Sequence, residues 1–382
     1  MNAPFKPDAP PEWNLSDLYV GRDDPRIETD LAAAKAANDE LASLEGMFLE
    51  ARKEPQRLGV LLDRGITLYE QATNGLWSVG AYAGLEASVA RDDPAWAKFE
   101  ADLRARSSQI AAESLFFTLE LNQLEDGEIA KALDAHPEAA RWAPWLRRVR
   151  LSRPHELSPE LERFIVDKAP AVANWVRLWD ETLAKLTARV GEESLTLAEA
   201  LNRLSDPDVA RRKAAADGLA KALEERVLTQ ALVLNTLAFE KQVEDRWRHY
   251  ETPAQSRHLA NEVDALEQAV VEAYPRLSHR YYALKAKVMG LEVLDYWDRN
   301  APLTAAAPRA YAWDEAKDMV LESFQDLAPK FADTARTFFN QPWIDARPRP
   351  GKQSGAFAHP VTAERHPFVF MNYMGERRDV LT

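Results

Sequence analysis

The feature that most constrains the fold is a helical recurrence of apolar residues that restarts at prolines. Pro25, Pro94 and Pro159 each follow Asp or Ser, the residue types that cap helix N-termini. After the first of these starts, the apolar residues that share one helix face are Ile27, Leu31, Ala34, Leu41, Leu44 and Phe48. Glycine is scarce, with 14 among 382 residues. The pattern predicts a mainly α protein built from antiparallel helical hairpins.

Two segments depart from this pattern and predict a small β element. Residues 186–197 alternate around a glycine turn and indicate a hairpin, and short strands are expected near 354–373. The expected organisation is an extended lead-in at 1–22, N-terminal helical hairpins at 23–115 and the rest of a helical N-terminal domain at 116–200. Residues 201–382 are expected to form the proximal part of a second domain, incomplete at its C-terminus. Within the lead-in, residues 13–19 are expected to anchor the chain to the body.

Composition excludes several classes of function. The formal net charge of −13 has the wrong sign for a general nucleic-acid or anionic-membrane binder. The absence of cysteine excludes disulfides, thiolate metal sites and a cysteine nucleophile. Because no signal peptide or run of 18 apolar residues occurs, we expect a cytoplasmic protein with neither nucleic-acid nor membrane partners.

No motif in the chain predicts a catalytic or metal-binding residue. No two of the seven histidines have the i, i+4 spacing of a helical zinc site. The segment 351–354 suggests a phosphate loop, but Ala346 and Gln353 stand where glycine and a hydroxyl residue are needed. The basic residues around it are expected to form a solvated turn; they are Arg347, Arg349, Lys352, Arg377 and Arg378. Taken alone, these patterns predict no catalytic residue and no metal ligand.

Several separated segments together carry a family resemblance. They are Trp13-Asn14-Leu15-Ser16-Asp17-Leu18-Tyr19, Arg153-Pro154-His155-Glu156-Leu157-Ser158, the tyrosine-rich segment 281–287, residues 296–303, Trp343-Ile344-Asp345, Gly351-Lys352-Gln353-Ser354-Gly355-Ala356-Phe357 and His366-Pro367-Phe368-Val369-Phe370-Met371-Asn372-Tyr373. Their order resembles that of oligoendopeptidase F and other thimet-oligopeptidase-like zinc metallopeptidases. The resemblance extends nearly end to end.

The resemblance implies zinc-dependent hydrolysis of short peptides. In that family a helix like the one beginning near 379–382 continues into His-Glu-x-x-His, a motif this sequence lacks. We therefore expect a chain truncated before that motif, with zinc in the complete family member but no cofactor here and no activity alone. The alternative is a non-catalytic helical module that binds peptides or acts as a scaffold.

The resemblance also implies a substrate-binding edge strand at Ser354, Gly355, Ala356 and Phe357, where a short peptide would pair through its main chain. The strand at 368–373 would lie next inward, and both strands could instead merely pack the domain. Loss of downstream helices is expected to leave Phe368, Phe370 and Tyr373 uncovered, which would promote association.

Overall fold

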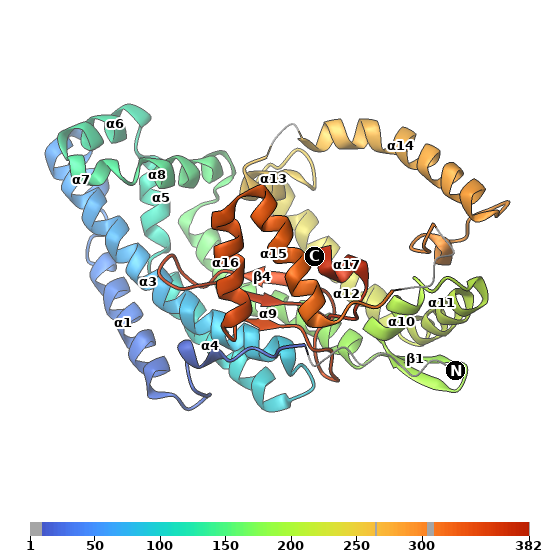
Figure 1. The fold of residues 1–382 in the computed structure, drawn as a ribbon. Coiled ribbons are helices and arrows are strands. Elements are labelled where there is room, and N and C mark those ends of the chain that lie inside the picture. The colour runs from blue at the N-terminus through green and yellow to red at the C-terminus, as the bar shows by residue number, and fades with distance from the viewer. Residues whose placement is uncertain (1–9, 264–265, 304–308, 382) are drawn as a thin grey trace.

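The structure is a computed structural model that describes residues 10–263, 266–303 and 309–381 (Figure 1). Its N-terminal hairpins are α1 (Pro25–Ala42), α2 (Met47–Glu50), α3 (Pro55–Val89) and α4 (Pro94–Ala112). The Asp24 and Asp93 carboxylates accept hydrogen bonds from the first free amides of α1 and α4, as the sequence predicts. The expected first helix is shorter than predicted, because Gly46 adopts a φ of +82° between α1 and α2.

A group of short helices covers one end of the long helix α3. They are α5 (Leu115–Gln123), α6 (Asp126–Ala135), α7 (Pro137–Ala140) and α8 (Ala143–Val149). Their shared core is centred on Phe48, Leu62 and Phe117, which are fully buried. Burial of such side chains contributes about 1.5–3 kcal/mol each to the stability of the fold. This core therefore holds the short helices against α3, and we call the helices α1 to α8 the N-terminal lobe.

The middle of the chain is again helical, with one hairpin. The elements are α9 (Pro159–Ala184), β1 (Thr187–Val190), β2 (Glu193–Thr196), α10 (Leu197–Arg203), α11 (Val209–Glu224), α12 (Val227–Trp247) and α13 (Gln255–Asn261). β1 and β2 pair antiparallel with Val190 opposite Glu193, which confirms the predicted hairpin. The last helices are α14 (Leu266–Met289), α15 (Trp313–Leu327), α16 (Pro329–Asn340) and α17 (Arg377–Leu381).

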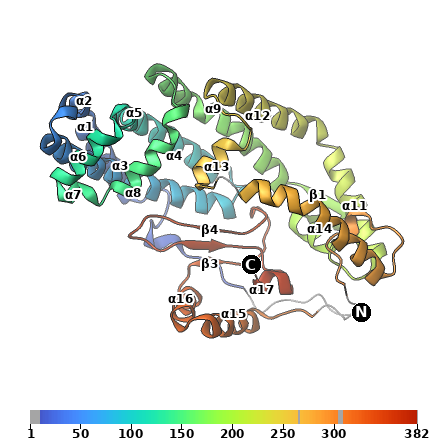
Figure 2. The same ribbon diagram turned by 90° about the horizontal axis from the view of Figure 1, so that it is seen from above.

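A three-stranded sheet near the C-terminus packs against the N-terminal lead-in. It contains β3 (Ile344–Asp345), β4 (Phe357–His359) and β5 (Phe368–Phe370) in the order β3-β5-β4. Seen from above, the sheet lies between the N-terminal helices and the α15–α16 pair (Figure 2). The lead-in anchor is confirmed, because Leu15, Leu18 and Tyr19 are buried in the core that includes Phe368.

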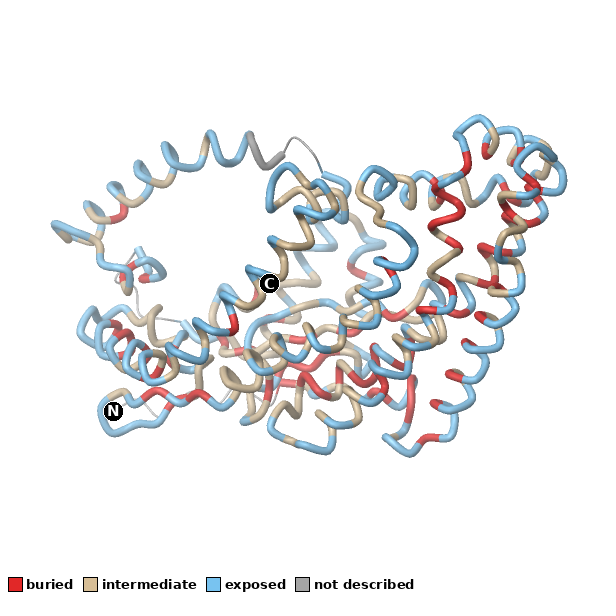
Figure 3. Tube along the Cα trace, turned by 180° about the vertical axis from the view of Figure 1, so that it is seen from behind, coloured by how far each residue is buried: buried red, intermediate tan, exposed pale blue. Residues whose placement is uncertain are grey.

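The expectation of an uncovered sheet is wrong. Phe368, Phe370 and Tyr373 are at most 1% exposed, because the N-terminal lobe and α15 cover both faces of the sheet. Exposed apolar surface lies instead on α14, which stands away from the other helices (Figures 1 and 3). Its exposed side chains recur at intervals of three or four and are Val270, Tyr274, Leu277, Tyr281, Leu284 and Val288. None of the described helices is long and apolar enough to cross a membrane.

Candidate functional site: a free strand edge at β4

Strand β4 has a free edge. The amides of Val369 and Met371 donate to the carbonyls of Trp343 and Asp345, on the β3 side. The N–H and C=O groups of the alternating residues Phe368 and Phe370 therefore face β4. In the antiparallel register these residues lie opposite His359 and Phe357. Because main-chain groups alternate sides along a strand, the N–H and C=O of Ala358 point away from the sheet. Ala358 is exposed and presents the donor and acceptor that a further strand would need.

A pocket of about 230 Å³ adjoins the start of this strand. Ser354, Gly355 and Ala356 line it together with residues of α10 and of the β5–α17 connection. The Oδ1 atom of Asn202, also in its lining, is buried with no hydrogen-bond partner among the described residues. The fourth predicted residue, Phe357, lies elsewhere: its ring stacks on Phe370 at 4.6 Å, within the sheet core.

The loop before β4 is held by one side chain. Asn372 Nδ2 donates to the carbonyls of Gln353 (2.9 Å) and Gly355 (3.0 Å). Gly355 has a φ of +94°, a left-handed conformation that side-chain-bearing residues rarely adopt. No atom lies within 4 Å of where a Cβ at Gly355 would be, so backbone conformation alone requires glycine there. The pocket wall is thereby fixed before a ligand binds.

The expectation of a solvated basic turn holds for Arg347, Arg377 and Arg378, which are exposed, but is wrong for Lys352 and Arg349. The Lys352 side chain is fully buried, and its Nζ lies 2.6 Å from Asp345 Oδ1 and donates to the carbonyls of Asp345, Arg347 and Met371. Arg349 makes a bidentate pair with the same Asp345 carboxylate, both contacts at 2.8 Å. Burial lowers the pKa of Lys352, while hydrogen bonding to Asp345 opposes that shift. Asp345 therefore ties the 347–352 turn to β3 and β5.

The start of α17 closes the other side of the pocket. Asp379 lies inside α17, in its first turn. Its Oδ2 accepts from the amides of Met374 (2.8 Å) and Glu376 (3.0 Å), reaching back over the helix start. Burial raises the pKa of Glu376. Asp379 thus holds the segment that leads from β5 into α17.

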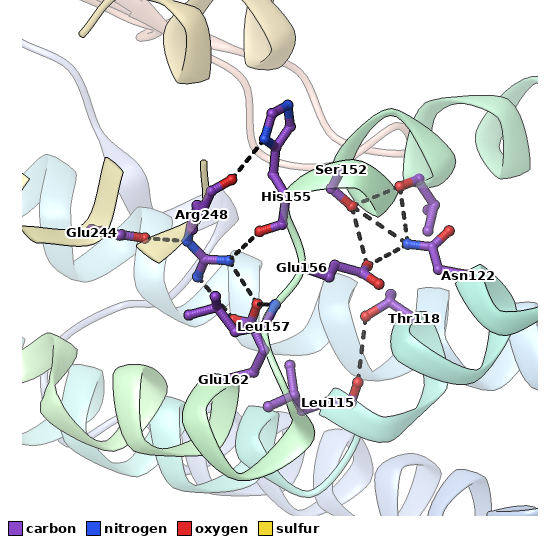
Figure 4. Close-up of polar contacts among 11 residues, drawn as sticks. Leu115, Thr118, Asn122, Ser152, His155, Glu156, Leu157, Glu162, Glu244 and Arg248 are labelled. Carbon is purple, nitrogen blue, oxygen red and sulfur yellow. Dashed lines mark hydrogen bonds and ion pairs between the residues drawn. The ribbon is translucent and has the colours of Figure 1, made fainter. Parts of the chain in front are cut away.

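The Pro-His-x-Leu-Ser-like element at 153–158 clamps α9 to α12 (Figure 4). Arg248 pairs with both oxygens of Glu162 (2.6 and 2.8 Å) and donates to the His155 carbonyl, while His155 Nδ1–H donates to the Arg248 carbonyl at 2.8 Å. Burial acts to raise the pKa of Glu162, but the hydrogen bonds from Arg248 outweigh it and the pKa is lowered. Burial raises the pKa of Glu156. This cluster has a structural role, because the bonds among His155, Arg248 and Glu162 link the start of α9 to the end of α12.

The described residues do not fit a zinc site. Among residues 10–263, 266–303 and 309–381, no group of three or more His, Cys, Asp or Glu side chains could hold a metal ion. The sequence also contains no His-Glu-x-x-His. Zinc hydrolysis needs about three protein ligands and a base, so none of the described residues is assigned to that metal.

The sequence does not predict two residues of the site, Ala358 and Asn202. Ala358 follows the predicted segment directly, and an alternation signal over 354–359 could have extended the strand to include it. Asn202 carries no such signal, because α10 reaches the pocket only through the tertiary fold. The resemblance therefore implies an edge strand but places it too early, since of its four residues only Phe357 lies in β4, and it does not give the opposite wall of the pocket.

Comparison with known proteins supports one class. The family model for oligopeptidase F matches residues 120–187. The chain is 23% identical to the group B oligopeptidase PepB of Streptococcus agalactiae over 95% of its length, and 20% identical to the oligopeptidase PepF of Bacillus subtilis over 97%. The solved oligoendopeptidase-F of Enterococcus faecium superposes on 82% of this chain, and on 66% of its own, with a TM-score of 0.61 at 18% identity.

The sequence matches support the oligopeptidase F family, in agreement with the resemblance of the motifs. The superposition on the solved structure shows a shared, mainly helical fold. It spans 60% of the length of the streptococcal relative and 55% of the Bacillus relative. The oligopeptidase activity that those names state belongs to those proteins.

Proposed function

We propose that this chain forms the peptide-binding side of an oligoendopeptidase site. A short extended peptide adds as a further strand beside β4, pairing with the main chain of Ala358. The observation that carries the proposal is the free edge of β4 directly beside the pocket lined by Ser354, Gly355 and Ala356. Main-chain pairing suits enzymes that accept varied sequences, because it does not depend on peptide side chains.

The local geometry supports this binding mode. Asn372 and the left-handed Gly355 hold the loop in place, so little conformational entropy is lost on binding. Asn202 offers a buried acceptor with no partner among the described residues, which a peptide N–H would satisfy. Both features are on the pocket side of β4.

The experiment measures binding of three peptides by calorimetry. They are an acetylated hexapeptide and two versions of it N-methylated at alternate residues, one version for each of the two possible registers. N-methylation removes main-chain donors, each worth about 0.5–1.5 kcal/mol. We expect the methylated peptide to bind about tenfold more weakly in one of the two methylation registers. Equal affinity of all three peptides would contradict strand addition.

A matched pair of variants tests the same point on the protein. Ala358→Pro removes the outward N–H without breaking a β4–β5 hydrogen bond, because proline is tolerated on an edge strand. Ala358→Val keeps the N–H and suits a strand. Ala358→Pro is expected to weaken peptide binding and Ala358→Val to leave it unchanged.

We further propose that residues 1–382 bind peptide without hydrolysing it. The support is the donor set, which contains neither the zinc-binding motif nor a group of described side chains fit for a metal. Zinc content and cleavage of a quenched fluorescent peptide are measured on the same sample. Stoichiometric zinc with turnover would contradict this part and leave the binding proposal standing.

A further inference from the structure

A second cavity lies at the far end of β4. It has a volume of about 580 Å³, within the range of ligand pockets. It is enclosed by α3, α4 and α5 and reaches the sheet at His359. The segment 354–359 therefore runs from the Ser354–Ala356 pocket at one end to this cavity, which we call the lobe cavity, at the other.

Asn38 brings to the lobe cavity a polar atom that has no partner among the described residues. Asn38 is 1% exposed, and its Nδ2 donates to the Ile110 carbonyl at 2.8 Å, which fixes the orientation of the amide. Its Oδ1 is buried with no hydrogen-bond partner among the described residues. An unsatisfied buried acceptor costs about 1–3 kcal/mol, and a donor from a ligand would remove that penalty.

Two aromatic rings join the cavity to β4. Trp77 stacks on His359 with ring centroids 5.8 Å apart, and its Nε1 donates to the Pro360 carbonyl at 3.2 Å. The Trp77 ring is half exposed, and the Nδ1 of His359 is buried without a partner among the described residues. A peptide that leaves the edge of β4 would meet these rings first.

One glycine in α3 lines the cavity without a packing reason to be glycine. Gly65 and Gly75 are explained by packing, because an added Cβ would lie 2.8 Å from Phe48 and 3.0 Å from Ala34. Gly80 also lines the lobe cavity, yet an added Cβ would meet nothing within 4 Å. Glycine inside a helix is unfavourable relative to alanine. Packing therefore gives no reason for Gly80, whereas close approach of a ligand to the α3 backbone would.

We propose that the lobe cavity is a subsite for one aromatic or large aliphatic side chain of the bound peptide. The proposal rests on the proposed function, since the peptide lying along β4 delivers that side chain past Trp77 and His359. Leu76, Leu103 and neighbouring alanines supply apolar contact. The N–H next to that side chain donates to Asn38 Oδ1. This subsite adds side-chain preference to a site that otherwise recognises main chain.

The experiment scans one phenylalanine through each position of an acetylated polyalanine-type hexapeptide, with affinity measured by calorimetry. Burial of one such side chain is worth about 1.5–3 kcal/mol, so one position is expected to bind about 10- to 100-fold more tightly. Gly80→Leu fills the cavity, because helical side chains lean toward the preceding turn, here Trp77. Gly127→Leu, at an open helical glycine in α6, is the matched control.

Gly80→Leu is expected to abolish the preference for phenylalanine and keep the affinity of the all-alanine peptide, and Gly127→Leu to change neither. A phenylalanine preference that survives Gly80→Leu, or no preference in the wild type, would overturn the subsite. A different result would contradict the proposed function: the Ala358→Pro variant would bind the all-alanine peptide as tightly as the wild type does. Asn38→Leu gives a second readout: it should weaken binding of the preferred peptide and leave the all-alanine peptide unaffected.

Discussion

Removal of the buried amine of Lys352 should loosen the loop that precedes β4. Lys352→Met keeps the length of the side chain but removes its ion pair with Asp345 and its hydrogen bonds to three carbonyls. Those carbonyls belong to Asp345 in β3, to Arg347 in the turn and to Met371, just after β5. The substitution therefore acts on the contacts that join the loop to the sheet.

The free energy lost in Lys352→Met depends on which partners of Asp345 remain. Breaking a buried ion pair by removing one partner costs about 3–5 kcal/mol. Arg349 still pairs with Asp345 in the variant through two contacts of 2.8 Å, so we expect the lower limit, about 3 kcal/mol. A loss of that size corresponds to a roughly 100-fold change in an opening equilibrium.

Hydrogen exchange measures that opening locally. The Met371 and Tyr373 amides donate to the carbonyls of Asp345 and Ala346 and report on the sheet beside the turn. In Lys352→Met they should exchange roughly 100-fold faster. Arg347→Met, which removes a surface pair with Glu12, is the control and should change exchange by less than about fivefold. Equal exchange in the Lys352 variant and the control would refute the role of the buried cluster.

Three further outcomes are expected. Burial raises the pKa of Glu120 above its unfolded value, so Glu120 contributes to a fall in unfolding free energy as pH rises between those two values; because burial also raises the pKa of Glu156 and Glu376, Glu120→Gln should reduce this fall without abolishing it, and Glu322→Gln should leave it unchanged. Gly355→Ala should destabilise by about 1–2 kcal/mol in denaturant unfolding through its positive φ, and no loss would contradict that strain. Arg248→Met should cost about 3 kcal/mol by leaving Glu162 buried, and adding Glu162→Met should restore most of it; equal loss in both variants would argue against the ion pair.

Much of the helical fold is predictable from local signals. Asp24 and Asp93 cap the helices that their prolines begin, and alternation around Gly191 predicts the β1–β2 hairpin. These signals work because capping and strand alternation involve residues close in sequence. β3 is different: two residues give no period, and its parallel pairing with β5 depends on a distant partner.

The candidate site is predictable only in part. The loop at 354–356 carries a family resemblance, and the structure brings those three residues together in one pocket. The burial of Lys352 could not be foreseen, because its charge suggests a surface and only the position of Asp345 reverses that. Asn38 and His359 are 321 positions apart in the chain, and only the packing of the N-terminal lobe on the sheet brings them to one cavity.

The most direct test of the central claim is exchange of the Ala358 amide with and without bound peptide. Its N–H faces outward, whereas those of Phe357 and His359 already face β5. With saturating peptide, the account predicts strong protection of Ala358 and little change at its two neighbours. Peptide that binds while the Ala358 amide exchanges as fast as before would contradict strand addition at β4.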